Sequence, residues 1–161
     1  MTKKMTEDEK IHKQFAVDLF NATWELLEKP VRTKEEDDEM IHRAHASRYH
    51  WGKVGTPVNL ARGEWQLARV YTVLNLPESA HYHALRSLEI CQANNIGDFD
   101  LAYAYEALAR VNSLRNKIIE CHYYLKLARK AGDAILEQED REHFFQDLGN
   151  IQIDRPFVSV D

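Results

Sequence analysis

The chain has 161 residues, with 21 Lys and Arg against 26 Asp and Glu, which gives a formal net charge of −5. This length fits one domain or a short repeat array, and the negative charge does not favour a general nucleic-acid binder. Only 6 Gly and 4 Pro are present, which argues against the many tight turns of an all-β fold. No apolar run is long enough to cross a bilayer, and two cysteines are too few for a disulfide scaffold. We therefore expect a cytoplasmic protein with no nucleic-acid or membrane partner.

The spacing of apolar residues predicts helices along most of the chain. Ile11, Phe15 and Leu19 follow one another at four-residue intervals, as on the apolar face of a helix. Thr33 followed by Glu36 fits a capping box, in which each side chain binds a backbone N–H at the helix start. We predict an all-α fold of seven helices, near residues 6–29, 34–53, 57–75, 77–94, 99–114, 117–131 and 134–148.

An internal repeat is the strongest signal in the sequence. The tetrapeptide Leu-Ala-Arg-Val at 67–70 recurs at 108–111, and the His-Tyr pair at 81–82 recurs at 122–123. Residues 67–82 and 108–123 are identical at 7 of 16 positions, with an offset of 41 residues. Each unit is predicted to be a helical hairpin, which cannot bury its apolar face alone, so we expect the two units to stack.

The two units resemble the tetratricopeptide repeat family. Ala68, Tyr71 and Ala80 match its pattern of a small residue, an aromatic residue three positions later, and a small residue early in the second helix. In the second unit, Ala109 and Cys121 match the two small positions. The offset exceeds the family's usual period of about 34 residues, so the chain is similar to a variant with longer helices.

This resemblance implies a single domain built as a right-handed stack of helical hairpins. An N-terminal helix pair would occupy residues 1–55, the two repeat units 56–132, and a capping helix with a short extended tail 133–161. The chain is also similar to small bacterial helical proteins that carry the stretch TPVN-x-A-x-G-x-W, which is found here at residues 56–65.

In the tetratricopeptide family, the first helices of successive units line a concave groove. Arg69 and Arg110 occupy equivalent positions, so the resemblance places two guanidinium groups side by side, an arrangement that recognises carboxylates or phosphates. Alternatively, both arginines form ion pairs with neighbouring acids such as Glu106. The resemblance places these residues in the groove: Arg62, Trp65, Arg69, Thr72, Tyr103, Glu106, Arg110 and Ser113.

We therefore expect an interaction module rather than an enzyme, with no cofactor. Its partner would be an acidic peptide, a protein terminus or a small anionic ligand, because the predicted groove combines arginines with aromatic residues, the residue types enriched at binding hot spots. The ligand-binding residues expected from the sequence are Arg62, Trp65, Arg69, Tyr103, Glu106 and Arg110.

Two other functions stay open from the sequence. Asp38, His42 and His45 could share one helix face, which is a partial metal site and the basis for a small metal-dependent enzyme. The simpler interpretation is an acidic, solvated first turn followed by partly packed imidazoles. The third possibility is a structural homo-oligomer, and the apolar residues of the tail could pack on their own chain or on a second copy: Ile151, Ile153, Phe157, Val158 and Val160.

Glu64 interrupts an apolar stripe, which leaves two interpretations. Either the helix is rotated so that the carboxylate reaches water, or a cation or an imidazole meets it inside the protein, because an unpaired buried charge is costly. We favour the rotation, since helix faces assigned from sequence shift easily by a residue or two. Cys91 and Cys121 lie on stripes of small residues, and we expect them to be buried packing residues.

Overall fold

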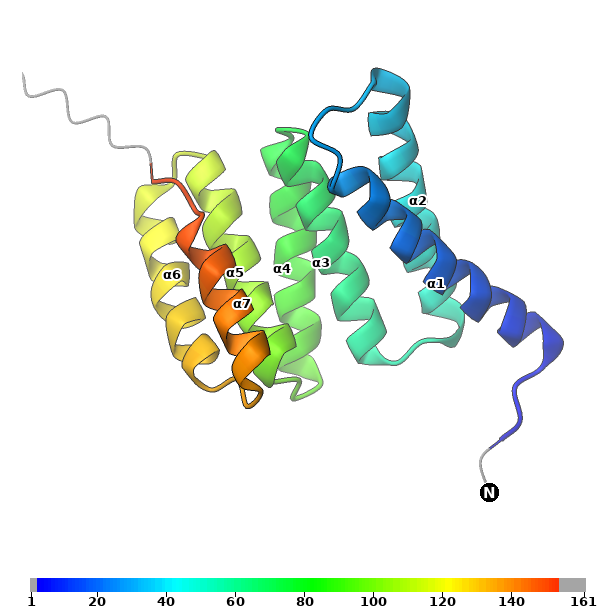
Figure 1. Cartoon of the computed structure of the whole chain (residues 1–161). Helices are drawn as coiled ribbons and strands as arrows, with labels where there is room; N and C mark the ends of the chain where they lie inside the picture. Colours follow the sequence, from blue (N-terminus) through cyan, green and yellow to red (C-terminus); the bar gives the residue numbers. More distant parts are fainter. Residues whose placement is uncertain (1–2, 154–161) are drawn as a thin grey trace, which may run out of the picture.

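A computed structural model describes residues 3–153 of the chain, and all the regular elements in that range are helices (Figure 1). The predicted all-α fold is therefore confirmed. The helices are α1 (Glu7–Leu27), α2 (Lys34–Val54), α3 (Pro57–Val73), α4 (Pro77–Ala93), α5 (Asp98–Leu114), α6 (Ile118–Asp133) and α7 (Gln138–Gly149).

The first helices begin where the capping residues predict. The Thr33 hydroxyl accepts a hydrogen bond from the Glu36 N–H, and the Glu36 carboxylate accepts one from the Thr33 N–H, which completes the capping box of α2. Thr6 forms the same arrangement at the start of α1. At α3, Pro57 is the first helical residue, a position where its missing N–H costs nothing.

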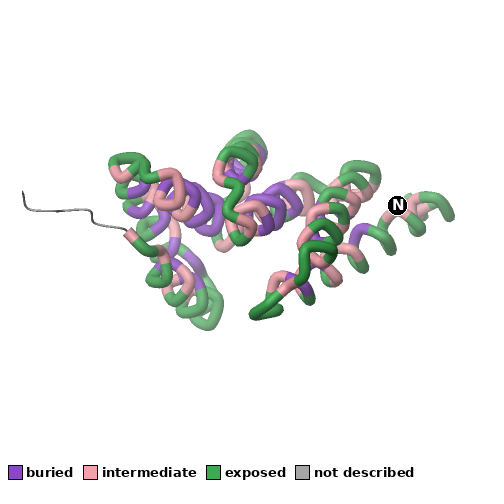
Figure 2. Tube along the Cα trace, turned by 90° about the horizontal axis from the view of Figure 1, so that it is seen from above, coloured by how far each residue is buried: buried purple, intermediate pink, exposed green. Residues whose placement is uncertain are grey.

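The seven helices form three antiparallel hairpins, α1–α2, α3–α4 and α5–α6, followed by α7 (Figure 1). The second helix of each hairpin also packs against the first helix of the next element, so α2 contacts α3, α4 contacts α5 and α6 contacts α7. The first helices contact one another in the order α1, α3, α5, α7. Seen from above, the buried residues concentrate in the middle of the stack of hairpins (Figure 2). This arrangement places α1, α3, α5 and α7 next to each other.

The internal repeat has a structural counterpart in the helix bounds and turns. The starts of α3 and α5, and of α4 and α6, are both 41 residues apart. The turns inside these hairpins contain Asn75 and Asn116, with φ angles of 56° and 57°, a left-handed conformation that asparagine tolerates better than most residues. The next amides, of Leu76 and Lys117, each donate to the carbonyl five residues earlier at 2.9 Å. The matched asparagines therefore close both hairpins in the same way.

Small residues occupy the sites where helices approach closely. Ala68 and Ala109 are at most 1% exposed, and Ala80 and Cys121 are 0% exposed. Cys91 is also fully buried, and burial raises the pKa of its thiol to about 11. Both cysteines are thus buried packing residues, as predicted.

Helix α7 begins later than the sequence predicts, at residue 138 instead of 134. Ile135 lies before the helix and is 1% exposed, because it packs into the same core as Phe144 and Leu148. Ile151 and Ile153 pack against this core as well, so the described part of the tail folds back on its own chain. The predicted tail residues Phe157, Val158 and Val160 lie outside the described residues.

Among the helices of residues 3–153, none is both long enough and apolar enough to span a lipid bilayer.

Candidate functional site

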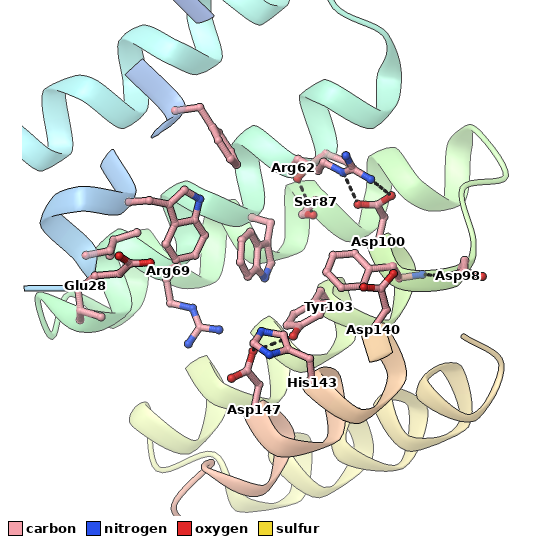
Figure 3. Close-up of a pocket in the computed structure, with 17 residues that line it drawn as sticks. Glu28, Arg62, Arg69, Ser87, Asp98, Asp100, Tyr103, Asp140, His143 and Asp147 are labelled. Carbon is pink, nitrogen blue, oxygen red and sulfur yellow. Dashed lines mark hydrogen bonds and ion pairs between the residues drawn. The ribbon is translucent and has the colours of Figure 1, made fainter. Parts of the chain in front are cut away.

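Helices α1, α3, α5 and α7 line a cleft of about 970 Å³ (Figure 3). The sequence-predicted residues Arg62, Trp65, Arg69 and Tyr103 all lie on its surface. The first helices of the hairpins thus line a shared cleft, with α3 and α5 between α1 and α7. Side chains from α1 and α7 complete the lining, and none of them was predicted from the sequence to lie in the groove.

A row of aromatic rings crosses the cleft from α1 to α5. The ring of Trp65 lies 5.6 Å from that of Trp24 and 5.5 Å from that of Tyr103, measured between centroids. Phe99 continues the row, 4.6 Å from Tyr103. Aromatic pairs at these separations contribute favourable edge and face contacts beyond simple burial. The row gives the cleft an extended apolar surface that a partner could cover.

Arg69 extends over this row with most of its donors uncommitted. Its guanidinium carbon lies 5.5 Å from the centroid of the Trp65 ring, and one terminal nitrogen lies 3.8 Å from Oε2 of Glu106. It forms no hydrogen bond with any residue between 3 and 153, while its side chain is 20% exposed. A guanidinium carries five N–H donors, so Arg69 can donate to a molecule in the cleft.

Arg62 is held by an acid on the neighbouring hairpin. Its Nε and one terminal nitrogen donate to the two carboxylate oxygens of Asp100 at 2.7 and 3.0 Å (Figure 3). The hydrogen bond to Asp100 raises the pKa of Arg62 despite the opposing effect of burial. This bidentate ion pair links α3 to α5 at the edge of the cleft. The charge of Arg62 is therefore already paired with Asp100.

Arg110 does not line the cleft beside Arg69, so that part of the expectation is wrong. Its Nε donates to Oε1 of Glu106 at 2.7 Å, and a terminal nitrogen donates to the backbone carbonyl of Asp147 at 2.9 Å. Glu106 is 0% exposed and lies between the two arginines. A buried carboxylate needs positive partners, which is why both guanidinium groups face it. The ion-pair alternative considered from the sequence is therefore confirmed.

Two further groove residues belong with Arg110 rather than with the cleft. Thr72 and Ser113 line a second pocket of about 360 Å³, together with residues 150–152 of the tail. The Ser113 hydroxyl donates to the Gln152 carbonyl. Residues 150–152 of the tail therefore lie against the part of the predicted groove that contains Thr72, Arg110 and Ser113.

Tyr103 connects the floor of the cleft to α7. Its side chain is 4% exposed, and its hydroxyl donates to Oδ2 of Asp147 at 2.7 Å. Burial and this hydrogen bond raise the pKa of Tyr103. His143 lies one turn before Asp147, with its Nε2 3.5 Å from the same carboxylate oxygen (Figure 3). These contacts fix the side of α7 that faces the cleft.

The charge of the lining differs from the expected cationic groove. Its two arginines, Arg62 and Arg69, are outnumbered by five carboxylates, and Arg62 is already paired with one of them. The carboxylates come from the end of α1, from α5 and from α7: Glu28, Asp98, Asp100, Asp140 and Asp147. The described lining is therefore predominantly acidic, which does not favour the expected acidic or anionic partner.

The residues proposed for a metal site do not form one. Asp38 pairs with Lys34, and His45 shares a hydrogen bond of 2.8 Å with the hydroxyl of Tyr71. His42 is exposed on α2. In residues 3–153, no group of three or more His, Cys, Asp and Glu side chains is arranged to hold a metal ion. The described residues therefore do not support the metal-dependent enzyme.

Glu64 lies in a buried polar cluster, so the preferred interpretation of a rotated helix was wrong. The residue is 8% exposed, Nε of Arg48 donates to its Oε1 at 3.0 Å, and Nδ1 of His83 lies 2.7 Å from its Oε2. The His83 ring stacks on Tyr71 with 5.5 Å between centroids. Burial alone would raise the pKa of Glu64, but His83 and Arg48 together hold it below the ordinary value. The cluster joins α2, α3 and α4 and is separate from the cleft lining.

Comparisons with protein-family models, with curated proteins and with solved structures find no significant match for this chain. The tetratricopeptide resemblance consequently stays a prediction from the repeat residues. The candidate site rests on the cleft itself.

Proposed function

We propose that this chain is a peptide-binding module of the tetratricopeptide type, not an enzyme, and that it binds a segment of a partner protein in the cleft. The observation that carries the proposal is the aromatic row of Trp24, Trp65, Tyr103 and Phe99 within a cleft of about 970 Å³. Aromatic and arginine side chains grouped at the centre of a surface are typical of interfaces.

The position of Arg69 supports a peptide in particular. A peptide chain offers a backbone carbonyl at every residue, and the Arg69 donors have no hydrogen-bond partner among residues 3–153. Apolar side chains of the same peptide could cover Trp24 and Trp65. We also place the protein in the cytoplasm, a reducing compartment that suits its two free, buried thiols.

Selection from a displayed library of random peptides tests this function. We expect the selected peptides, once synthesised, to bind wild-type protein and to lose about tenfold in affinity for Trp24→Ala, because a hot-spot aromatic contributes more than about 1 kcal/mol. Tyr82→Ala is the matched control, since Tyr82 is 62% exposed and lies outside the cleft lining. Thermal melting of each variant separates lost binding from lost folding.

Two results would contradict the proposal. One is that no peptide is enriched over an empty support. The other is that the selected peptides respond to Tyr82→Ala and not to Trp24→Ala.

A further inference from the structure

The acidic side of the cleft bears on which peptide would bind there. Asp140, His143 and Asp147 lie on one side of α7 at spacings of three and four residues, and all three line the cleft. They share it with the ring of Tyr103 on α5 (Figure 3) and with that of Phe99 on the same helix. One wall of the cleft is therefore acidic, and the neighbouring surface is aromatic.

Several of these carboxylates have no cation of their own. Glu28 and Asp140 form no ion pair with any residue in the range 3–153, and both are exposed. Asp147 accepts the Tyr103 hydroxyl and faces an imidazole that is charged only when protonated. Asp100 is bound through both oxygens by Arg62, and the two oxygens of Asp98 accept the backbone N–H groups of Phe99 and Leu136. Negative charge is thus available to a partner at two edges of the cleft.

We propose that the partner segment is basic, with a Lys or Arg side chain bound between the carboxylates of Asp140 and Asp147 and the half-buried ring of Phe99. This inference rests on the proposed peptide-binding function and names the chemistry of its partner. A cation near an aromatic face is attracted by the ring quadrupole, and the adjacent carboxylates add charge complementarity. The wall that selects the cation belongs to α7, while Arg69 donates to the peptide backbone.

The charge of Arg69 does not reverse the negative sign of the lining. Its guanidinium faces Glu106, which is fully buried and has one carboxylate oxygen, Oε2, without a hydrogen-bond partner. The lining therefore keeps an excess of negative charge when Arg69 is counted, with five carboxylates against two guanidinium groups. A basic segment is favoured over an acidic one, and the preference is expected to weaken as salt screens it.

Three versions of one library-selected peptide test the inference, with Lys, Gln or Glu at a single position. We expect selected peptides to be enriched in Lys and Arg, and affinity to fall in the order Lys, Gln, Glu. Asp140→Asn should weaken binding of the Lys version about three- to fivefold, as for a partly exposed charge pair, and leave the Gln version unchanged. Glu139→Gln is the matched control, because Glu139 is exposed on the same helix and lies outside the cleft lining.

A second variant and a salt titration strengthen the test. Asp147→Asn keeps an oxygen that can accept the Tyr103 hydroxyl, so it removes the charge with the fold intact, and it should act in the same direction as Asp140→Asn. Binding of the Lys version should weaken between about 50 and 500 mM NaCl more than binding of the Gln version.

The possible failures are distinguishable. If peptides bind with Trp24 dependence but prefer Glu, or bind Lys and Gln versions equally, the basic-partner inference is overturned and the peptide-binding function stands. If Glu139→Gln weakens binding as much as Asp140→Asn, the proposed cation position is wrong. If no peptide binds, both proposals fail.

Discussion

At the residue scale, Glu64 shows how a single buried carboxylate organises its surroundings. Its two oxygens are bound by Arg48 from α2 and by His83 from α4, so one side chain on α3 joins three helices and two hairpins. Hydrogen bonds to a charged buried group contribute more than neutral ones, and leaving their partners unsatisfied is costly. The stability of the junction between the first two hairpins therefore depends on the charge of this residue.

We expect Glu64→Gln to destabilise the protein by about 2 kcal/mol at pH 7, measured by urea unfolding. Glu89→Gln is the control, because its pair with Arg86 is exposed on both sides, and it should change stability by less than about 0.5 kcal/mol. If both variants lower the free energy of unfolding by the same amount, the buried ion pairs of Glu64 stabilise the protein no more than an exposed pair does.

The effect of Glu64→Gln on the free energy of unfolding should depend on pH, in a direction set by the pKa shift of Glu64. The pKa of Glu64 in the folded protein lies below its ordinary value of 4.5, so its stabilising contribution is complete above that value. It is lost as the pH falls through the folded pKa. The difference between wild type and Glu64→Gln should therefore be constant near neutral pH and shrink below about pH 4.5. A difference that grows on acidification would contradict the direction of the shift.

Sequence reasoning could identify Glu64 as unusual but could not determine its partners. The residue stands out because it interrupts an apolar stripe, whereas Arg48 and His83 are 16 and 19 residues away in sequence and meet it only through the packing of α2 and α4. Arg110 poses the same difficulty. It repeats Arg69 in sequence, yet α7 provides the carbonyl that binds it, and the first repeat has a different neighbour.

At the element scale, α7 is attached through a close approach to α6. A Cβ atom added at Gly132 would lie 2.4 Å from an atom of the Phe144 ring, and Phe144 is fully buried. The ring therefore fits against α6 only because residue 132 has no side chain. Because α7 provides one wall of the cleft, this contact links the stability of the last helix to the candidate binding site.

We expect Gly132→Ala to displace Phe144 and to lower the free energy of unfolding by about 1–3 kcal/mol, the range for overpacking a core. Gly149→Ala is the matched control, because an added Cβ there meets nothing within 4 Å. Thermal unfolding followed by circular dichroism measures both. Equal stability of the two variants would show that α7 does not depend on this contact.

The start of α7 also shows the limits of periodicity. Apolar spacing predicted a helix from residue 134, but Ile135 is buried in the turn before the helix, and the Leu136 N–H donates to Asp98 on α5. These contacts fix the chain in a turn that helical spacing alone cannot distinguish from a first helical turn.

At the scale of the whole molecule, the repeat determined most of what could be predicted. The predicted bounds of α3 to α6 agree with the structure to within two residues, and the offset of 41 residues accounts for the matched helix starts and asparagine turns. The cleft could be predicted only in part, because two of its walls come from segments outside the repeat. Asp140 and Asp147 make the lining acidic where a cationic groove was expected, and Trp24 extends its aromatic surface. None of these three residues belongs to a repeated position.

We proposed that a basic peptide binds in the cleft between α1 and α7, and the indole N–H signals of ¹⁵N-labelled protein would report that binding at the cleft itself. The chain has 3 Trp: Trp24 and Trp65 line the cleft, whereas Trp51 does not. The Lys version of the selected peptide should shift the Trp24 and Trp65 signals and leave the Trp51 signal in place, with single Trp→Phe variants providing the assignments. A shift confined to Trp51, or unchanged Trp24 and Trp65 signals at a saturating peptide concentration, would contradict the account.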